Sequence, residues 1–274
     1  MHAHKYRSLK INRSGTQIAE LELLGPGRGN AMGPDLWREL PQAMAEIEAD
    51  PGLRALIVRG SGEHFSYGLD LPGMASELGP ILSQGARGRV AIVHLAAQMQ
   101  SGFAALANSR LSIIAAIDGW CIGAGLELAC ACDLRIATHQ ARFALREVKV
   151  GIVADLGGLQ RLPHIVGEGW ARELALLGDD FDAQQALSMS LVTRLVENAD
   201  NLQTEAKLIA ERLCANPPLV TAGIKTVMNA RIEATIQSGN HLAASLNGML
   251  MQSEDFAEAM RAFMERRSAS FQGQ

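Results

Sequence analysis

The chain has 274 residues, 48% of them hydrophobic, and a formal net charge of −4 at pH 7. This length suits one large domain or a core with a small appendage, and this apolar content suits a globular protein with a sizeable core. The small negative charge gives no basic footprint for nucleic acid or for an anionic membrane, so we expect neither as a partner. The first ten residues lack the apolar segment of a secretory signal. We also expect no later stretch long enough to span a bilayer.

Strands and helices alternate through the first half of the chain. The segments YRSLKIN and QIAELELL flank a Ser-Gly turn, and their alternating pattern predicts a hairpin. A helix is expected from Pro34 to Ala49, followed by a short buried strand in LRALIVRGSG. The periodicity then predicts a long helix from Ala86 to Asn108.

The second half begins with LSIIAAIDG, which reads as another buried strand and leads directly into the glycine-rich WCIGAGLELACA. CDLRIAT and ARFAL are typical of two further short strands. After about Glu197 the pattern is wholly helical. The sequence therefore predicts an α/β fold, with a core over residues 1–197 and a helical C-terminal region over 198–274.

The four cysteines show no CxxC spacing. Cys130 and Cys132 are separated by one residue, which is a spacing that a metal site could use, but His139 is the only histidine close to them. Buried free thiols are the favoured interpretation for these two and for Cys121 and Cys214. This cysteine usage predicts a reducing, cytoplasmic compartment.

Two glycine-containing turns are candidate sites for a negatively charged oxygen. Gly123, Ala124 and Gly125 precede the helix that begins LELACA, where small residues let a ligand approach unpaired backbone N–H groups. A purely structural turn is the alternative, whereas a dinucleotide fingerprint would need one more glycine. In HFSYGLDLPGM, Gly68 precedes Leu69, and an ordinary tight turn is again the alternative.

The segment FALREVKVGIVADLGGLQRLP places Glu147 and Asp155 eight residues apart in a largely apolar run. Burying an unpaired carboxylate is costly, so these are either loop charges that reach solvent or a proton-transfer pair in a dry pocket. Apolar neighbours such as Ile152 and Val153 should raise the pKa of both carboxyl groups by desolvation. The plainer interpretations are a surface charge for Glu147 and, for Asp155, the cap of a helix beginning near Leu156.

Five motifs, in order, resemble the crotonase (enoyl-CoA hydratase/isomerase) superfamily over nearly the whole chain. They are GRGNAMGPDLWREL, FSYGLDL, IIAAIDGWCIGAGLELACACDLRIA, REVKVGIVADLGGLQRLP and EDFAEAMRAFMERR. The resemblance implies a spiral of ββα turns with C-terminal helices that build trimers, often paired into hexamers.

Members of that superfamily hold the thioester oxygen of an acyl-CoA with two backbone N–H groups while it becomes an enolate. By motif position the two donors are Leu69 and Ala124. Ala124 stands where most relatives have glycine, so its methyl group must fit beside the thioester. The substrate-binding residues implied by the resemblance are Tyr67, Gly68, Leu69, Asp70, Leu71 and Ala124.

The same resemblance gives roles to three acidic residues. In hydratases of the family, glutamates matching Glu127 and Glu147 activate a water molecule. In its Δ3,5-Δ2,4-dienoyl-CoA isomerases, a glutamate and an aspartate eight residues apart match Glu147 and Asp155 and move a proton along the acyl chain. The other motifs also look more like the isomerase, although the isomerase has aspartate at the position of Glu127. We assign Glu147 to C2 of the substrate and Asp155 to C6.

The sequence therefore predicts an isomerase that shifts a 3,5-dienoyl-CoA to a 2,4-dienoyl-CoA without a metal or redox cofactor, coenzyme A being part of the substrate. The alternatives are a 2-enoyl-CoA hydratase and a non-catalytic binding protein of the same fold. Arg266 is a candidate contact for a CoA phosphate, against the default of a solvated helix face. A homotrimer or hexamer is expected, and apolar residues that a lone chain leaves uncovered are expected at Leu242, Leu246, Leu250 and Phe256.

Overall fold

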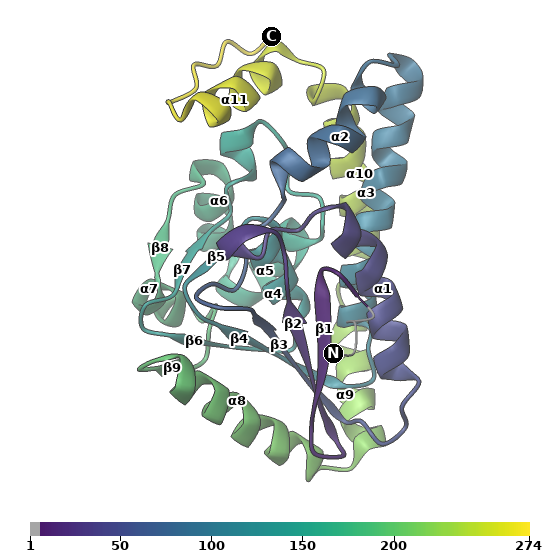
Figure 1. Ribbon diagram of the computed structural model, residues 1–274, viewed down its shortest axis with the longest axis vertical. Helices are drawn as coiled ribbons and strands as arrows, with labels where there is room; N and C mark the ends of the chain where they lie inside the picture. Colours follow the sequence, from purple (N-terminus) through teal and green to yellow (C-terminus); the bar gives the residue numbers. More distant parts are fainter. Residues whose placement is uncertain (1–5) are drawn as a thin grey trace.

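The computed structural model describes residues 6–274 and places a mixed six-stranded sheet at the centre of the chain (Figure 1). The strand order is β1-β2-β3-β4-β6-β9, in which β1 and β2 pair antiparallel and all the other neighbours pair parallel. The strands are β1 (Leu9–Ser14), β2 (Ile18–Leu23), β3 (Ala55–Gly60), β4 (Ser112–Ile117), β6 (Leu134–Thr138) and β9 (Leu195–Val196). The predicted hairpin and buried strands are confirmed.

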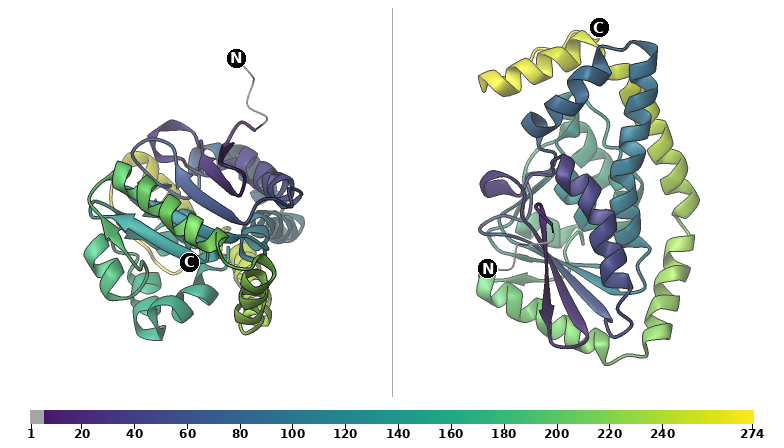
Figure 2. Two further views of the ribbon diagram at one scale, coloured as in Figure 1. Left: turned by 90° about the horizontal axis from the view of Figure 1, so that it is seen from below. Right: turned by 45° about the vertical axis from the view of Figure 1, so that its right-hand side comes forward.

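Apolar side chains cover both faces of this sheet, as expected for parallel strands that read as continuous hydrophobic runs. Leu56, Val58 and Ile113 face the larger core, which contains the buried stripes of the first and third helices. Ile57 and Ile114, which alternate with them, face a second core on the other side of the sheet. Helix α8 (Ala199–Cys214) covers that second face, as Figure 2 shows from below.

A second sheet of three short strands carries the predicted strand ARFAL. It consists of β5 (Trp120–Ile122), β7 (Arg142–Ala144) and β8 (Phe181–Asp182). The sequence analysis missed β5 and β8, because strands of three and two residues are too short to show a period. This small sheet sets the starting point of the glycine-rich turn, since Gly123 follows β5 directly.

The helices before residue 197 connect these strands. They are α1 (Pro34–Glu48), α2 (Leu71–Leu82), α3 (Ala86–Ala107), α4 (Ala124–Ala131), α5 (Gly158–Val166), α6 (Glu168–Leu177) and α7 (Ala183–Ser188), with 3-10 turns η1 (Gly27–Gly29) and η2 (Glu147–Val150). The expected helices at α1 and α3 are confirmed to within two residues. The sequence analysis missed α2, having treated its start as part of a loop.

Only helices follow Val196 in the described chain. They are α8 (Ala199–Cys214), α9 (Pro218–Ala230), α10 (Glu233–Leu250) and α11 (Glu254–Glu265). Helix α10 runs beside α3, and α11 lies at the end of the molecule where it contacts η2 (Figure 1). The C-terminal helices therefore border the segment that carries Glu147.

Helix α3 corrects one expectation from the sequence. Its 22 residues have a mean hydropathy of 1.4 over an 18-residue window, which is long and apolar enough to cross a membrane. Our expectation that no stretch reaches this length was therefore wrong. In the structure, 39% of that window is buried, and α3 packs against α1, α2 and α10.

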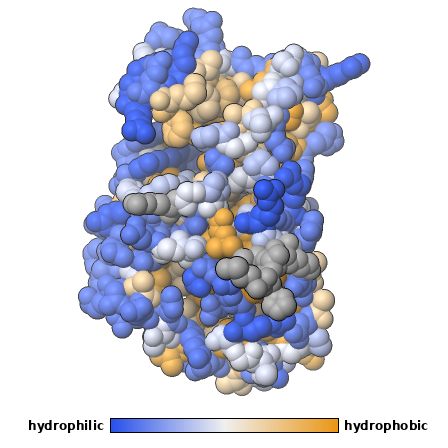
Figure 3. All heavy atoms as spheres, in the orientation of Figure 1, coloured by the Kyte–Doolittle hydropathy of each residue, from blue (hydrophilic) through white to orange (hydrophobic). Residues whose placement is uncertain are grey.

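Large apolar side chains remain exposed on the C-terminal helices. Leu219 and Val227 on α9 are 87% and 74% exposed, and Leu242 on α10 is 61% exposed. Leu250 is also exposed and Leu246 is partly buried, as expected. Phe256 departs from the expectation because it is buried, at 8% exposure. Figure 3 shows apolar residues over α11 and α2 on a face that is otherwise largely hydrophilic.

Candidate active site

Backbone pairing brings the two predicted donor turns together. The Ser66 N–H donates to Trp120 O at 2.9 Å, and the Ile122 N–H donates to Ser66 O at 2.9 Å. The two segments therefore run side by side as a short parallel bridge before they reach Leu69 and Ala124. The turns that the sequence analysis considered separately form one site.

Gly68 is the residue that allows this close approach. Its φ is +80°, and a Cβ atom there would lie 2.6 Å from Ile122 O and 3.1 Å from Ala124 N. Any residue with a Cβ atom at this position would both strain the backbone and push the two turns apart. Within residues 6–274, neither the Leu69 N–H nor the Ala124 N–H donates a backbone hydrogen bond, and Ala124 is the first residue of α4. Both N–H groups are therefore free to bind an oxygen atom.

Ala124 itself is 4% exposed and belongs to the hydrophobic core. The fold therefore accommodates the methyl group of Ala124, and the expected fit of that methyl group beside a thioester stays a prediction. Asp70 fixes the next turn, because its carboxylate accepts from the Gly73 N–H at 3.1 Å and caps α2. The cap aligns the start of α2 behind Leu69.

A cavity of about 420 Å³ opens beside these donors. Tyr67, Leu69, Asp70 and Leu71 line it, and so does Glu147, whereas Gly68 and Ala124 are not among its lining residues. One predicted donor and one predicted acid therefore line the same cavity, and the binding of substrate by these residues stays a prediction.

Glu147, the first residue of η2, presents its carboxylate to the glycine-rich turn. A Cβ atom on Gly123 would lie 2.8 Å from Glu147 Oε1, so the glycine leaves room for the carboxylate. Its Oε2 atom is buried and has no hydrogen-bond partner among the described residues. Burial, and then the negative charge of Asp155, raise the pKa of Glu147 to about 7. The interpretation of Glu147 as a surface charge is therefore wrong.

Glu127 on α4 is 1% exposed and accepts hydrogen bonds from the Leu156 N–H at 3.0 Å and the Gly158 N–H at 2.7 Å. The Gly158 N–H is the first of α5 and the Leu156 N–H lies just before the helix, so Glu127 caps α5 from another part of the chain. Burial, followed by the charges of Glu147 and Asp155, raises the pKa of Glu127 well above its ordinary value. The three predicted acids therefore interact within one buried region.

Asp155 is not a helix cap, because α5 begins at Gly158 and no side chain caps it from the N-cap residue, Gly157. Instead, the Asn247 side chain donates to Asp155 Oδ2 at 2.9 Å. Burial raises the pKa of Asp155 to about 6, against the Asn247 hydrogen bond, which lowers it. The interpretation of Asp155 as a cap is wrong, and Glu127 takes the capping role.

A second apolar cavity lies on the other side of Glu147. It has a volume of about 420 Å³ and shares Glu147 and Ile152 with the first cavity. Val153 and Ala154, the two residues before Asp155, line it together with apolar residues of α5 and α6. Glu147 and Ile152 therefore line both cavities.

A hollow of about 680 Å³ adjoins the first cavity and shares Arg146, Val150 and Phe263 with it. Arg267 lines this hollow and pairs with Glu258 through two hydrogen bonds. The neighbouring Arg266 is exposed at the C-terminal end of α11. The suggested contact between Arg266 and a CoA phosphate stays a prediction.

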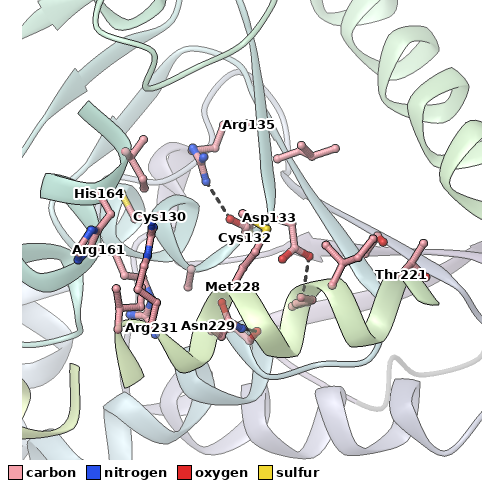
Figure 4. Close-up of a pocket in the computed structure, with 18 of the residues that line it drawn as sticks. Cys130, Cys132, Asp133, Arg135, Arg161, His164, Thr221, Met228, Asn229 and Arg231 are labelled. Atoms are coloured by element: carbon pink, nitrogen blue, oxygen red, sulfur yellow. Dashed lines mark hydrogen bonds and ion pairs between the residues drawn. The ribbon is translucent and has the colours of Figure 1, made fainter. Parts of the chain in front are cut away.

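Another cavity, of about 600 Å³, contains none of the predicted site residues. Figure 4 shows Cys130, Cys132 and Asp133 on one of its walls, with Met228 and Asn229 of α9 nearby. All four cysteines of the chain are buried free thiols, as expected. No group of three His, Cys, Asp or Glu residues within 6–274 is arranged to hold a metal ion.

The sequence analysis missed the two amide side chains that hold Asp155. Asn247 on α10 and Gln100 on α3 both reach it, and Gln100 donates to its backbone carbonyl at 2.7 Å. The one available signal was an asparagine on the same buried face of its helix as the small residues Ala244 and Gly248. A buried amide in such a position requires a partner.

Comparisons with known proteins agree with this geometry. The sequence profile described as "Enoyl-CoA hydratase/isomerase" matches residues 13–274. The chain is 34% identical to the peroxisomal Delta(3,5)-Delta(2,4)-dienoyl-CoA isomerase of Arabidopsis thaliana, covering 99% of both chains. It is 32% identical to a crotonyl-CoA hydratase of Syntrophomonas wolfei, covering 93% of this chain and 94% of that protein.

Comparison with solved structures identifies the same family. The crystal structure of an enoyl-CoA hydratase/isomerase from Pseudoalteromonas atlantica T6c superposes with a TM-score of 0.84 at 27% identity, covering 97% of this chain and 100% of that one. The predicted α/β crotonase fold is confirmed by this match. The chain therefore belongs to the enoyl-CoA hydratase/isomerase family.

Proposed function

We propose that the protein converts a 3,5-dienoyl-CoA to a 2,4-dienoyl-CoA. The observation that carries this proposal is the pair of carboxyl groups, Glu147 and Asp155, both with a raised pKa, together with the unpaired N–H groups of Leu69 and Ala124. Glu147 and Leu69 line the same cavity. Relatives from Arabidopsis thaliana and Dictyostelium discoideum, each 34% identical to this chain, are named as Delta(3,5)-Delta(2,4)-dienoyl-CoA isomerases.

In the proposed mechanism, the N–H groups of Leu69 and Ala124 bind the thioester oxygen. Glu147, ionised, removes a proton from C2, and the electron pair moves onto that oxygen to form an enolate that is conjugated with both double bonds of the substrate. The donors stabilise this charge more than they stabilise the neutral thioester, which lowers the barrier. Asp155, protonated, then delivers a proton to C6, which leaves double bonds at C2 and C4. Proton exchange with solvent resets the two carboxyl groups.

Two carboxyl groups are needed because C2 and C6 lie several bonds apart along a rigid conjugated chain. A single carboxylate cannot reach both carbons without moving, whereas a pair on either side can act in turn. Because these steps need only acids and backbone donors, no metal or redox cofactor is part of the proposal. Four buried free thiols support a reducing compartment such as the cytoplasm.

Hydration of a 2-enoyl-CoA is the second candidate. Glu127 and Glu147 interact electrostatically, and relatives of similar identity are named as hydratases. However, Glu127 Oε2 already accepts two backbone N–H groups, which favours a structural role for that oxygen over activation of water. Incubation with a 3,5-dienoyl-CoA and, separately, with a 2-enoyl-CoA separates the candidates. A gain of dienoyl thioester absorbance supports the isomerase, loss of enoyl absorbance supports the hydratase, and no change supports a binding protein.

Substitution of the two acids tests their separate roles. We expect Asp155→Asn to lower the isomerisation rate by about 100-fold or more, since the amide keeps the size of the side chain but cannot donate the proton to C6. Exchange of the C2 hydrogen with deuterated water should persist, because Glu147 and the donors remain. Glu147→Gln should abolish both exchange and isomerisation. Exchange that survives Glu147→Gln but vanishes in Asp155→Asn would reverse the assigned roles.

The rate should depend on pH as a bell-shaped curve. The active form of the pair carries a single proton, on Asp155. Because the pKa values of Asp155 and Glu147 are about 6 and about 7, this is the less populated of the two singly protonated forms, and its population is greatest between those values. Below the lower value a second proton neutralises the base, and above the higher value the last proton leaves the acid, so kcat/KM should fall on both sides. Measurement of kcat/KM from about pH 5 to about pH 9 checks this expectation. A flat profile over that range would contradict it.

The oxyanion donors are tested by Gly68→Ala. The added Cβ would lie 2.6 Å from Ile122 O at a φ of +80°, so the turn must shift and carry the Leu69 N–H away from the thioester. We expect kcat to fall on the order of 100- to 1000-fold. Gly169→Ala on α6 is the matched control, because a Cβ there meets nothing within 4 Å. Equal activity in the Gly68→Ala and Gly169→Ala proteins would remove Leu69 from the donor pair.

The proposal includes assembly into a homotrimer or a pair of trimers. Leu219, Val227 and Met228 are 87%, 74% and 63% exposed on α9, an apolar surface that a monomeric protein seldom leaves uncovered. Light scattering at micromolar concentration should therefore give three or six times the chain mass, and Val227→Asp should lower it. A monomeric mass for the unaltered protein would refute this part of the proposal.

A further inference from the structure

Asn247 occupies an unusual position for an amide side chain. It lies in the last turn of α10, is 3% exposed, and projects toward the segment between η2 and α5. Its Oδ1 accepts from the Val153 N–H at 2.8 Å, and its Nδ2 donates to Val153 O at 2.8 Å and to Asp155 Oδ2 at 2.9 Å. The two Nδ2 protons thus have two acceptors, so the donor capacity of the amide is fully used.

The chemistry of these partners fixes the orientation of the amide. If Oδ1 and Nδ2 were exchanged, the oxygen would face the Val153 carbonyl and the Asp155 carboxylate, and the nitrogen would face the Val153 N–H. Every contact would then be repulsive. The nitrogen of Asn247 therefore points at the carboxylate.

We propose that Asn247 is a positioning residue for proton transfer at C6: it binds one oxygen of Asp155, Oδ2, and thereby holds the carboxyl group against the acyl chain. This inference rests on the proposed isomerase function. The side-chain hydrogen bonds of Asn247 go to Val153 and Asp155, so it acts on the reaction through Asp155. It also links the C-terminal helical region to the site, because Asp155 lies 92 residues earlier in the chain.

A second amide provides the comparison that isolates this role. Gln100 on α3 donates to the backbone carbonyl of Asp155 at 2.7 Å and makes no contact with its carboxylate in the described structure. Gln100 and Asn247 therefore hold the same residue from two packed helices, one through the main chain and one through the side chain. Loss of either amide should loosen the segment that carries Asp155. Only loss of Asn247 removes a hydrogen bond from the carboxyl group itself.

The surroundings decide the direction of that alteration. The charged groups that interact with Asp155 are Glu127 on α4 and Glu147 on η2, while Arg161 on α5 acts on Glu127. The groups that reach Asp155 from α3 and α10 are the neutral amides. A donor to a carboxylate stabilises its ionised form, so removal of Asn247 should raise the pKa of Asp155 above about 6.

The experiment compares Asn247→Leu and Asn247→Ser with Gln100→Leu. Leucine keeps the size of asparagine without its donors, and serine is a smaller polar replacement in case leucine disturbs folding. For both Asn247 variants we expect kcat to fall roughly 10- to 100-fold with little change in KM. We expect the pKa of Asp155 to rise by about one unit. The maximum of the pH profile lies midway between the two apparent pKa values of the pair, so it should move up by roughly half a pH unit. The pH profile of Gln100→Leu should keep its maximum at the same pH as that of the unaltered protein.

A second readout does not depend on turnover. Aspartate labelled with 13C at the side-chain carboxyl, with the Asp155 signal assigned by Asp155→Asn, reports the titration of Asp155 by NMR in the free protein. An upward shift of that titration in the Asn247 variants supports the inference, and an unchanged titration overturns it. An equal shift of the Asp155 titration in Gln100→Leu also overturns the inference, because the shift would then come from loosening of the segment between η2 and α5. If the unaltered protein does not isomerise a 3,5-dienoyl-CoA, the proposed function fails. The NMR titration would still test whether Asn247 controls the pKa of Asp155.

Discussion

Three carboxyl groups share one buried region of this protein, and the rest of the site is arranged around the cost of placing them there. Glu127, Glu147 and Asp155 each lose hydration and repel one another, so each has a raised pKa. Their partners differ. Glu127 has two backbone N–H groups and Asp155 has the amide of Asn247, whereas the Oε2 atom of Glu147 has no described partner. A buried carboxylate oxygen without a partner is a strong candidate to bind a proton in a reaction.

Small residues make this arrangement possible. Gly123 and Gly158 stand where a Cβ atom would lie within 3 Å of the carboxyl groups of Glu147 and Glu127, and Gly68 stands where one would separate the donor turns. The donors, the acids and the helices that hold them come from segments far apart in the chain, which the central sheet and the C-terminal helices bring together (Figure 1). The family relationship is independent of this geometry and agrees with it.

Most of the fold could be predicted from the sequence, because buried strands such as β3 and β4 and amphipathic helices such as α1 carry a clear period. The motifs also identified Glu147 and Asp155. Strands β5 and β8 were missed because they are too short to show a period, and the cap of α5 was misassigned because it comes from Glu127, about thirty residues earlier. Asn247 could not be found for the same reason, since its contact with Asp155 spans 92 positions and leaves no local pattern. Composition alone also cannot separate a helix that packs against other helices, as α3 does, from a membrane span.

The central claim is that Glu147 and Asp155 transfer a proton along a dienoyl chain. The most direct measurement is NMR of the product formed from a 3,5-dienoyl-CoA in deuterated water. A 2,4-dienoyl thioester that carries deuterium at C6 is the predicted result, because Asp155 exchanges its proton with solvent before it donates. Formation of a 3-hydroxyacyl product would contradict the account. Recovery of only unreacted substrate, with no deuterium at C2 or C6, would also contradict it.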